Sequence, residues 1–156
     1  MTGQRFTTEE MLARLIAFDT TSRDGNIPLI EFVEDYLDGW GVPHFRVDYE
    51  VGKKTNLFAT IGPDIAGGIV LSGHTDVVPV EGQKWDTDPF RAELGDGRLY
   101  GRGASDMKGF VGIALALAPQ FVANGLREPL HFALSYDEEI GCIGVRGLIS
   151  DLAANG

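Results

Sequence analysis

Three short segments of the chain carry a histidine and carboxylates of the kind that bind metal ions. His74 and Asp76 lie two positions apart, Asp106 follows a glycine-rich stretch, and Glu138 and Glu139 are adjacent. One imidazole with several carboxylates suits a borderline-to-hard divalent cation, such as zinc, cobalt or manganese rather than copper. An aspartate can bridge two ions through its two oxygens, and two ions about 3.5–4 Å apart can polarise water and a carbonyl group. The residue types therefore indicate metal-assisted hydrolysis.

The remaining carboxylates offer the other roles that such a site needs. Asp76 could accept a hydrogen bond from the ring nitrogen of His74 that faces away from the metal, which would fix the tautomer. Of Glu138 and Glu139, one could bind metal while the other takes the proton of the attacking water. Spacing alone does not decide which glutamate has which role.

The elements around these residues place them at one edge of a sheet. The apolar spans 69–72 and 130–136 predict buried strands, and a helix is predicted from Asp106 or Met107 to about Asn124. The histidine then follows one strand, the aspartate opens the helix, and the two glutamates follow the other strand. In α/β folds, ligands bind beyond the carboxyl ends of strands, so the three segments are expected to meet there.

The rest of the chain alternates between helices and strands. Thr7 and Glu10 fit a capping box that opens a helix, and Asp96-Gly97 is a hairpin signal. The helix after Asp106 is apolar on nearly all sides and is expected to be buried. Helices are also predicted over 7–18, 28–39 and 144–154, strands over 44–49 and 55–61, and an ordered loop over 77–91. This order predicts an α/β layer architecture.

Composition excludes several classes of function. The chain has 156 residues, enough for one domain with a core, and a formal net charge of -10. That charge argues against nucleic acid and against an anionic membrane surface as partners. Cys142 is the single cysteine, which excludes an intrachain disulfide and a cysteine-rich zinc cluster. The N-terminus has no signal-peptide pattern and no apolar run reaches a membrane span, so we expect a cytoplasmic protein.

Several residues have plainer interpretations than catalysis. His44 lies in a predicted strand and is expected to have a surface or strand-pairing role. His131 opens a buried strand and is expected to be a polar residue with its hydrogen bonds satisfied. Cys142 is expected to be a small buried thiol rather than a nucleophile. Lys108 could neutralise charge at the site or be a solvated lysine at the start of a helix. Trp85 could line a substrate pocket or simply pack in its loop.

Taken together, the three motifs resemble those of the di-zinc M20 metallopeptidases and deacylases. The resemblance covers the chain from about residue 7 onward. Within the family, the segments 78–85, 88–90, 106–110 and 138–146 look most like the enzymes that remove the acetyl group from N2-acetyl-ornithine. Desuccinylases of succinyl-diaminopimelate, aminoacylases and dipeptidases of the same family are the alternatives.

The resemblance implies a role for each site residue. His74 would bind one zinc ion, Glu139 the other, and Asp106 would bridge them, with cobalt as a possible substitute for zinc. Glu138 would be the general acid/base, and Asp76 the carboxylate that orients the histidine. It also implies a cis peptide after Asp106, a small N-acyl amino acid as substrate, and a three-layer, doubly wound α/β sheet of the zinc-peptidase type.

Family members are much longer than this chain. They supply a further acidic ligand, a C-terminal histidine, and a lid domain that usually makes a homodimer. We therefore expect residues 1–156 to be a single, truncated domain, the N-terminal portion of a metallohydrolase catalytic domain, without the lid and with one protein ligand lacking for each metal. A non-catalytic fragment is the alternative of a different class. A truncated parallel sheet would also expose an unpaired edge.

Overall fold

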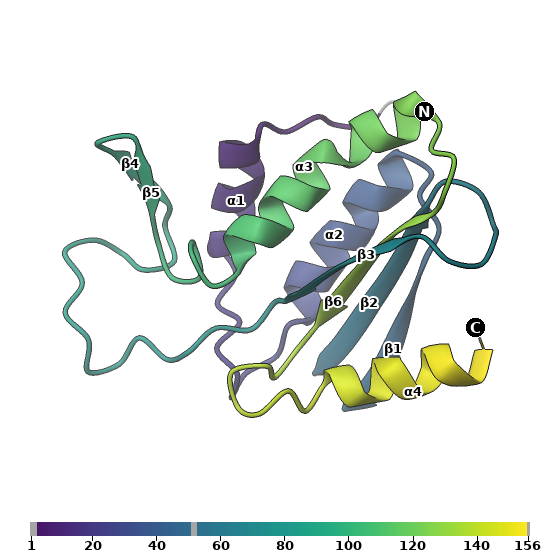
Figure 1. Cartoon of the computed structure of the whole chain (residues 1–156). Helices are drawn as coiled ribbons and strands as arrows, with labels where there is room; N and C mark the ends of the chain where they lie inside the picture. The colour runs from purple at the N-terminus through teal and green to yellow at the C-terminus, as the bar shows by residue number, and fades with distance from the viewer. Residues whose placement is uncertain (1–2, 51–52, 156) are drawn as a thin grey trace.

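The structure is a computed structural model that describes residues 3–50 and 53–155. In the described chain, α1 and α2 are followed by β1 to β5, and then by α3, β6 and α4 (Figure 1). In chain order they are α1 (Thr8–Ile16), α2 (Ile27–Gly39), β1 (His44–Glu50), β2 (Lys54–Ile61), β3 (Ile69–His74), β4 (Glu93–Gly95), β5 (Arg98–Tyr100), α3 (Lys108–Asn124), β6 (Leu130–Ser135) and α4 (Val145–Asn155). The α/β architecture expected from the sequence is confirmed.

Four strands form a sheet in the order β1-β2-β6-β3. Only β3 and β6 run parallel, while β1 with β2 and β2 with β6 are antiparallel. The sheet is thus mixed, and the parallel pairing expected from the sequence is confined to one pair of strands. That pair matters for the site, because its two carboxyl ends lie at the same edge of the sheet.

Helices cover both faces of the sheet, which gives three layers (Figure 1). Leu57, Phe132 and Leu134 pack into the larger core with residues of α1, α2 and α3. Phe58 and Ala133 point to the opposite face and meet Leu148 of α4. Side chains alternate between the faces of a strand, so continuous apolar runs in β2 and β6 are what a sheet covered on both sides requires.

Local signals at the first two helices are confirmed. Thr7 accepts a hydrogen bond from the backbone of Glu10, whose side chain accepts one from the backbone of Thr7 in turn. Pro28 lies in the first turn of α2, where its missing N–H removes no helical hydrogen bond. Both helix starts were therefore encoded by neighbours in sequence.

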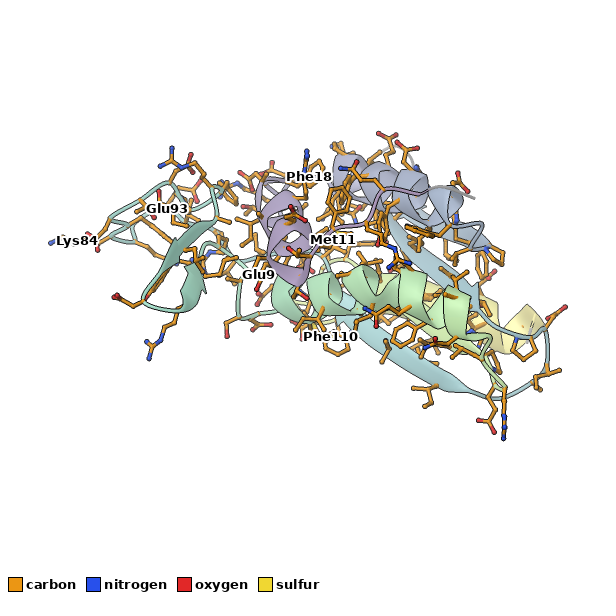
Figure 2. All side chains as sticks on the ribbon, turned by 90° about the horizontal axis from the view of Figure 1, so that it is seen from above. Glu9, Met11, Phe18, Lys84, Glu93 and Phe110 are labelled. Atoms are coloured by element: carbon orange, nitrogen blue, oxygen red, sulfur yellow. The ribbon has the colours of Figure 1, made fainter. Side chains whose placement is uncertain are left out.

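The helix α3 differs from the expectation in one respect. Its inner side is buried through Val111, Leu115 and Ala118, but Phe110 and Ile113 are 41% and 49% exposed. Phe110 lies on the outer side of the helix in Figure 2. The prediction of burial all round was wrong, because the described chain provides no element to cover this side.

A long segment between β3 and α3 extends away from the sheet (Figure 1). It includes the β4–β5 hairpin, which turns at Asp96 and Gly97 with φ of 51° and 71°. Positive φ at both positions is the geometry that Asp-Gly favours in two-residue hairpins. Lys84 and Glu93 lie on this projecting part in Figure 2, well apart from the sheet. Within 3–50 and 53–155, no helix has the length and apolar character needed to cross a membrane.

Candidate metal centre

The parallel pair β3–β6 brings two of the three motifs together. The register pairs His74 with Ser135, so the chain that leaves β6 reaches Glu138 and Glu139 beside the histidine. Asp106 comes from the turn before α3. One potential ligand atom from each of His74, Asp106 and Glu139 lies within 4.8 Å of the other two. Three residues that are distant in sequence therefore converge as the motifs predicted.

His74 is fixed in orientation by the residue two positions on. Its Nδ1 lies 3.0 Å from the backbone carbonyl oxygen of Asp76. Because a carbonyl oxygen only accepts, Nδ1 carries the proton and donates, which directs Nε2 toward the site. Nε2 lies 3.1 Å from Asp106 Oδ1 and 3.7 Å from Glu138 Oε2. Burial lowers the pKa of His74, but the carboxylates of Asp76 and Asp106 outweigh burial and raise the pKa to about 9.

Asp76 is a buried carboxylate that connects several segments. Its Oδ1 lies 3.4 Å from His74 Nδ1 and accepts a hydrogen bond from the Glu138 N–H at 3.1 Å. Its Oδ2 accepts from Ser22 Oγ at 2.7 Å and from the Glu139 N–H at 3.2 Å. Burial favours the protonated acid, yet the hydrogen bonds from His74 and Ser22 hold the pKa below its usual value. Asp76 thus lies beside the histidine ring and also accepts hydrogen bonds from the backbone of both glutamates.

The acidic side chains surround an open cavity. The side chains of Asp106 and Glu138 are 76% and 44% exposed, whereas that of His74 is 5% exposed. A cavity of about 340 Å³ is lined by His74, Asp106, Glu138 and Cys142, among others. Burial raises the pKa of Glu139. His74 lowers this pKa, whereas the carboxylate of Asp106 raises it further. The peptide between Asp106 and Met107 is cis, as the family resemblance implied.

The donor set fits a divalent metal such as zinc. It offers one imidazole, whose Nδ1 faces a backbone carbonyl so that Nε2 points into the site, and carboxylate oxygens from two other segments. Imidazole with carboxylates is the set found in catalytic zinc sites, which keep a position open to solvent. The mutual repulsion of Asp106, Glu138 and Glu139 is also of the kind that a bound cation relieves.

The structure adds residues that the motifs did not reveal. Ser22 and Lys54 make buried hydrogen bonds within this region, and no local pattern in the sequence singled them out. Lys108 is buried rather than solvated: its Nζ donates to the carbonyl oxygens of Leu15 and Phe18 at 3.0 and 2.7 Å. Burial lowers its pKa to about 8.

The surroundings of Cys142, His131 and Trp85 decide between the interpretations of these residues. Cys142 is exposed, so the expected burial was wrong, and its Sγ lies 3.6 Å from Glu138 Oε1. His131 is structural as expected, with ring nitrogens 2.9 Å from Thr60 Oγ1 and 3.1 Å from the Gly67 carbonyl. Trp85 lies under the guanidinium of Arg102, which favours loop packing.

The fold and the cluster of potential ligands are of the kind found in α/β metallohydrolases, and comparison with known proteins identifies the family. Residues 70–156 match the family described as peptidase family M20/M25/M40. The match covers more than half of the chain, so the chain belongs to this family.

Curated relatives align with most of this chain. An acetylornithine deacetylase of Myxococcus xanthus is 41% identical over 143 residues, which are 88% of this chain and 37% of that protein. An acetylornithine deacetylase of Pasteurella multocida is 35% identical over 147 residues, 90% of this chain and 38% of that protein. The chain thus spans somewhat more than a third of the length of these relatives.

Solved structures show the same fold. An M20 family metallo-carboxypeptidase from Sulfolobus solfataricus superposes with a TM-score of 0.80 at 22% identity, over 94% of this chain and 34% of the other. Human carnosine dipeptidase 1 gives a TM-score of 0.77 at 26% identity, over 92% and 35%. The chain therefore has the fold of part of an M20 catalytic domain.

Proposed function

We propose that this chain carries part of the metal site of an amidohydrolase that removes the acetyl group from N2-acetyl-ornithine, giving ornithine and acetate. The cluster of His74, Asp106 and Glu139 carries the metal-dependent part of the proposal. The identity of 35–41% to acetylornithine deacetylases over nearly the whole chain supports the substrate.

Each site residue has one role in the proposed reaction. His74 and Glu139 would each hold one metal ion, and Asp106 could contribute a carboxylate oxygen to each. Bound zinc supplies Lewis-acid polarisation of the amide carbonyl and of water. Glu138 accepts the proton of the attacking water and returns it to the departing amine. Its carboxylate lies 3.7 Å from His74 Nε2 and is 44% exposed, which leaves it free to exchange a proton with bound substrate.

The test is a zinc titration by calorimetry beside a turnover assay on the 156-residue chain. The substrates are N2-acetyl-ornithine, a succinylated amino acid, another N-acetyl amino acid and the dipeptide carnosine. We expect zinc binding and release of ornithine from the first. Preferential hydrolysis of carnosine would instead indicate a dipeptidase. Human carnosine dipeptidase 1, one of the similar structures, is named for that activity. Zinc binding without turnover of any substrate would favour the non-catalytic fragment.

The variant Glu138→Gln separates the two glutamates. It keeps the shape of the side chain but removes the base, so turnover should fall by at least about 10²-fold. Zinc affinity should stay within about threefold, while His74→Ala should lose most of it. Retained turnover in Glu138→Gln would move the role of base to another group.

A further inference from the structure

Behind the site lies a buried ion pair that no part of the proposed reaction uses. Lys54 Nζ donates to both carboxylate oxygens of Asp137, each at 2.8 Å. It also donates to the carbonyl oxygen of Ser22 at 2.7 Å, so the ammonium group has three acceptors. Lys54 and Asp137 are 8% and 6% exposed. The pair is thus fully hydrogen-bonded and shielded from water.

The pairing of β2 with β6 explains why these residues meet. The antiparallel register aligns Leu57 with Leu134. Continuing the same register by three residues places Lys54, at the start of β2, opposite Asp137, just beyond the end of β6. The ion pair therefore extends the strand pairing past the last residue of β6 and into the turn that carries Glu138 and Glu139.

Asp137 is the residue at which the chain turns from the strand toward the site. Its φ is 54°, in the left-handed region that Asp and Asn tolerate better than other non-glycine residues. Its side chain is held inside by Lys54, while the next two residues reach the cavity. The direction of the chain at Glu138 therefore depends on how firmly Asp137 is fixed.

A closed circuit of hydrogen bonds connects this anchor to the proposed ligands. Lys54 binds Asp137 and the Ser22 carbonyl, and the Ser22 hydroxyl donates to Asp76 at 2.7 Å. Asp76 in turn accepts from the N–H groups of Glu138 and Glu139. The glutamate turn is thus held from two sides, by Lys54 through Asp137 and by Ser22 through Asp76.

We propose that the Lys54–Asp137 ion pair positions the Glu138-Glu139 turn, so that Lys54 and Asp137 are positioning residues of the metal centre. A buried ion pair gives little net stability compared with apolar residues of the same volume, so geometry is the better account of its presence. The catalytic meaning of this inference rests on the proposed function, but the positioning itself does not.

The first test is hydrogen exchange of the metal-free 156-residue chain. The variants are Asp137→Asn and the double variant Lys54→Met with Asp137→Asn, which leaves no unpaired buried charge. In both we expect the Glu138 and Glu139 amides to exchange at least tenfold faster, with β6 still protected. The control is Glu34→Gln, which breaks the ion pair of Glu34 with Arg46, away from the site. It should leave those two amides unchanged.

The second test is zinc affinity together with the visible spectrum of the cobalt-loaded chain. In the two site variants we expect zinc to bind about 10–100-fold more weakly and the cobalt spectrum to shift, while Glu34→Gln keeps both. A purely structural role would lower the thermal midpoint alike in site and control variants, without these changes. Unchanged amide exchange in a folded double variant would overturn the positioning role. Absence of zinc binding in the wild type, with faster exchange in the variants, would instead overturn the metal-dependent function.

Discussion

At the scale of single residues, Asp76 has the most connected side chain of the proposed site. It approaches His74 and accepts hydrogen bonds from Ser22 and from the backbone of Glu138 and Glu139. All of these partners donate, so only a group whose two oxygens both accept satisfies them. The carboxylate is therefore needed for its acceptor capacity as much as for its charge.

The substitution Asp76→Asn should weaken metal binding while preserving the fold. The amide group would place an NH₂ donor against backbone N–H donors, so the glutamates would lose one tether and His74 its carboxylate neighbour. We expect zinc affinity to fall by about 10–100-fold, measured by calorimetry. Asp64→Asn, in an exposed turn outside the site, is the control. Equal affinities for both variants would contradict the orienting role of Asp76.

The same scale shows what the sequence could reveal about the site. His74, Asp106 and the two glutamates were predictable because each stands in a short local motif next to a strand or helix. Ser22 and Lys54 were not, since they reach the site only through pairing across the fold. Cys142 was predicted to be buried from residue type alone, although it lies exposed in the turn after Glu139.

At the scale of elements, a buried lysine connects α1 with the start of α3. Lys108 donates to the carbonyl oxygens of Leu15 and Phe18, at and just beyond the C-terminal end of α1. The last carbonyls of a helix lack a full set of helical donors. Lys108 adds a donor to Leu15 O, which also accepts from the Phe18 N–H at 3.3 Å, and to Phe18 O beyond the helix. This contact holds α1 beside the turn that presents Asp106.

The variant Lys108→Met should be less stable, with a different dependence on pH. Burial lowers the pKa of Lys108 from 10.5 to about 8 in the folded chain. Between these pH values the unfolded chain holds a proton that the folded chain has lost, so the lysine's contribution to stability increases as pH rises from about 8 toward 10. Urea unfolding at pH 7.5, 8.5 and 9.5 measures it. Parallel pH profiles for wild type and variant would contradict the shifted pKa.

The ends of helices and strands were largely predictable from the sequence. Which sides of a helix are covered by other elements was not. The capping box at Thr7, Pro28 in α2 and Asp96-Gly97 in the hairpin are local signals, and each appears where expected. Phe110 and Ile113 are exposed because no described element packs against their side of α3. The spacing of apolar residues within one helix does not reveal which other elements pack against it.

At the scale of the whole molecule, one edge of the sheet is apolar and unpaired within the described chain. The strand β3 pairs with β6 on one side, and Ile69 and Val70 are 62% and 52% exposed. Beside them, an apolar cavity of about 500 Å³ is lined by Leu71, Phe121 and Leu130, among others. An edge strand of this kind is a template for pairing with another chain.

The 156-residue chain should therefore self-associate in a concentration-dependent way. A lysine on an edge strand opposes such pairing, so Val70→Lys should weaken association by about tenfold or more in sedimentation velocity. Ile149→Lys adds the same charge on α4, where Ile149 is also exposed, and should leave association unchanged. Equal weakening by both substitutions would point to net charge rather than to the edge of β3.

The meeting of His74 with Asp106 has a consequence for how the chain holds together. The two residues are 32 positions apart, and the projecting segment lies between them. If His74 and Glu139 each hold one ion and Asp106 shares both, metal binding would close two long loops at once, in the way that covalent crosslinks do. A crosslink over a loop of this length stabilises the folded state by about 3–4 kcal/mol, because it lowers the entropy of the unfolded chain. Metal binding would then act on chain entropy as well as on chemistry, and loss of the ion would loosen three distant segments together.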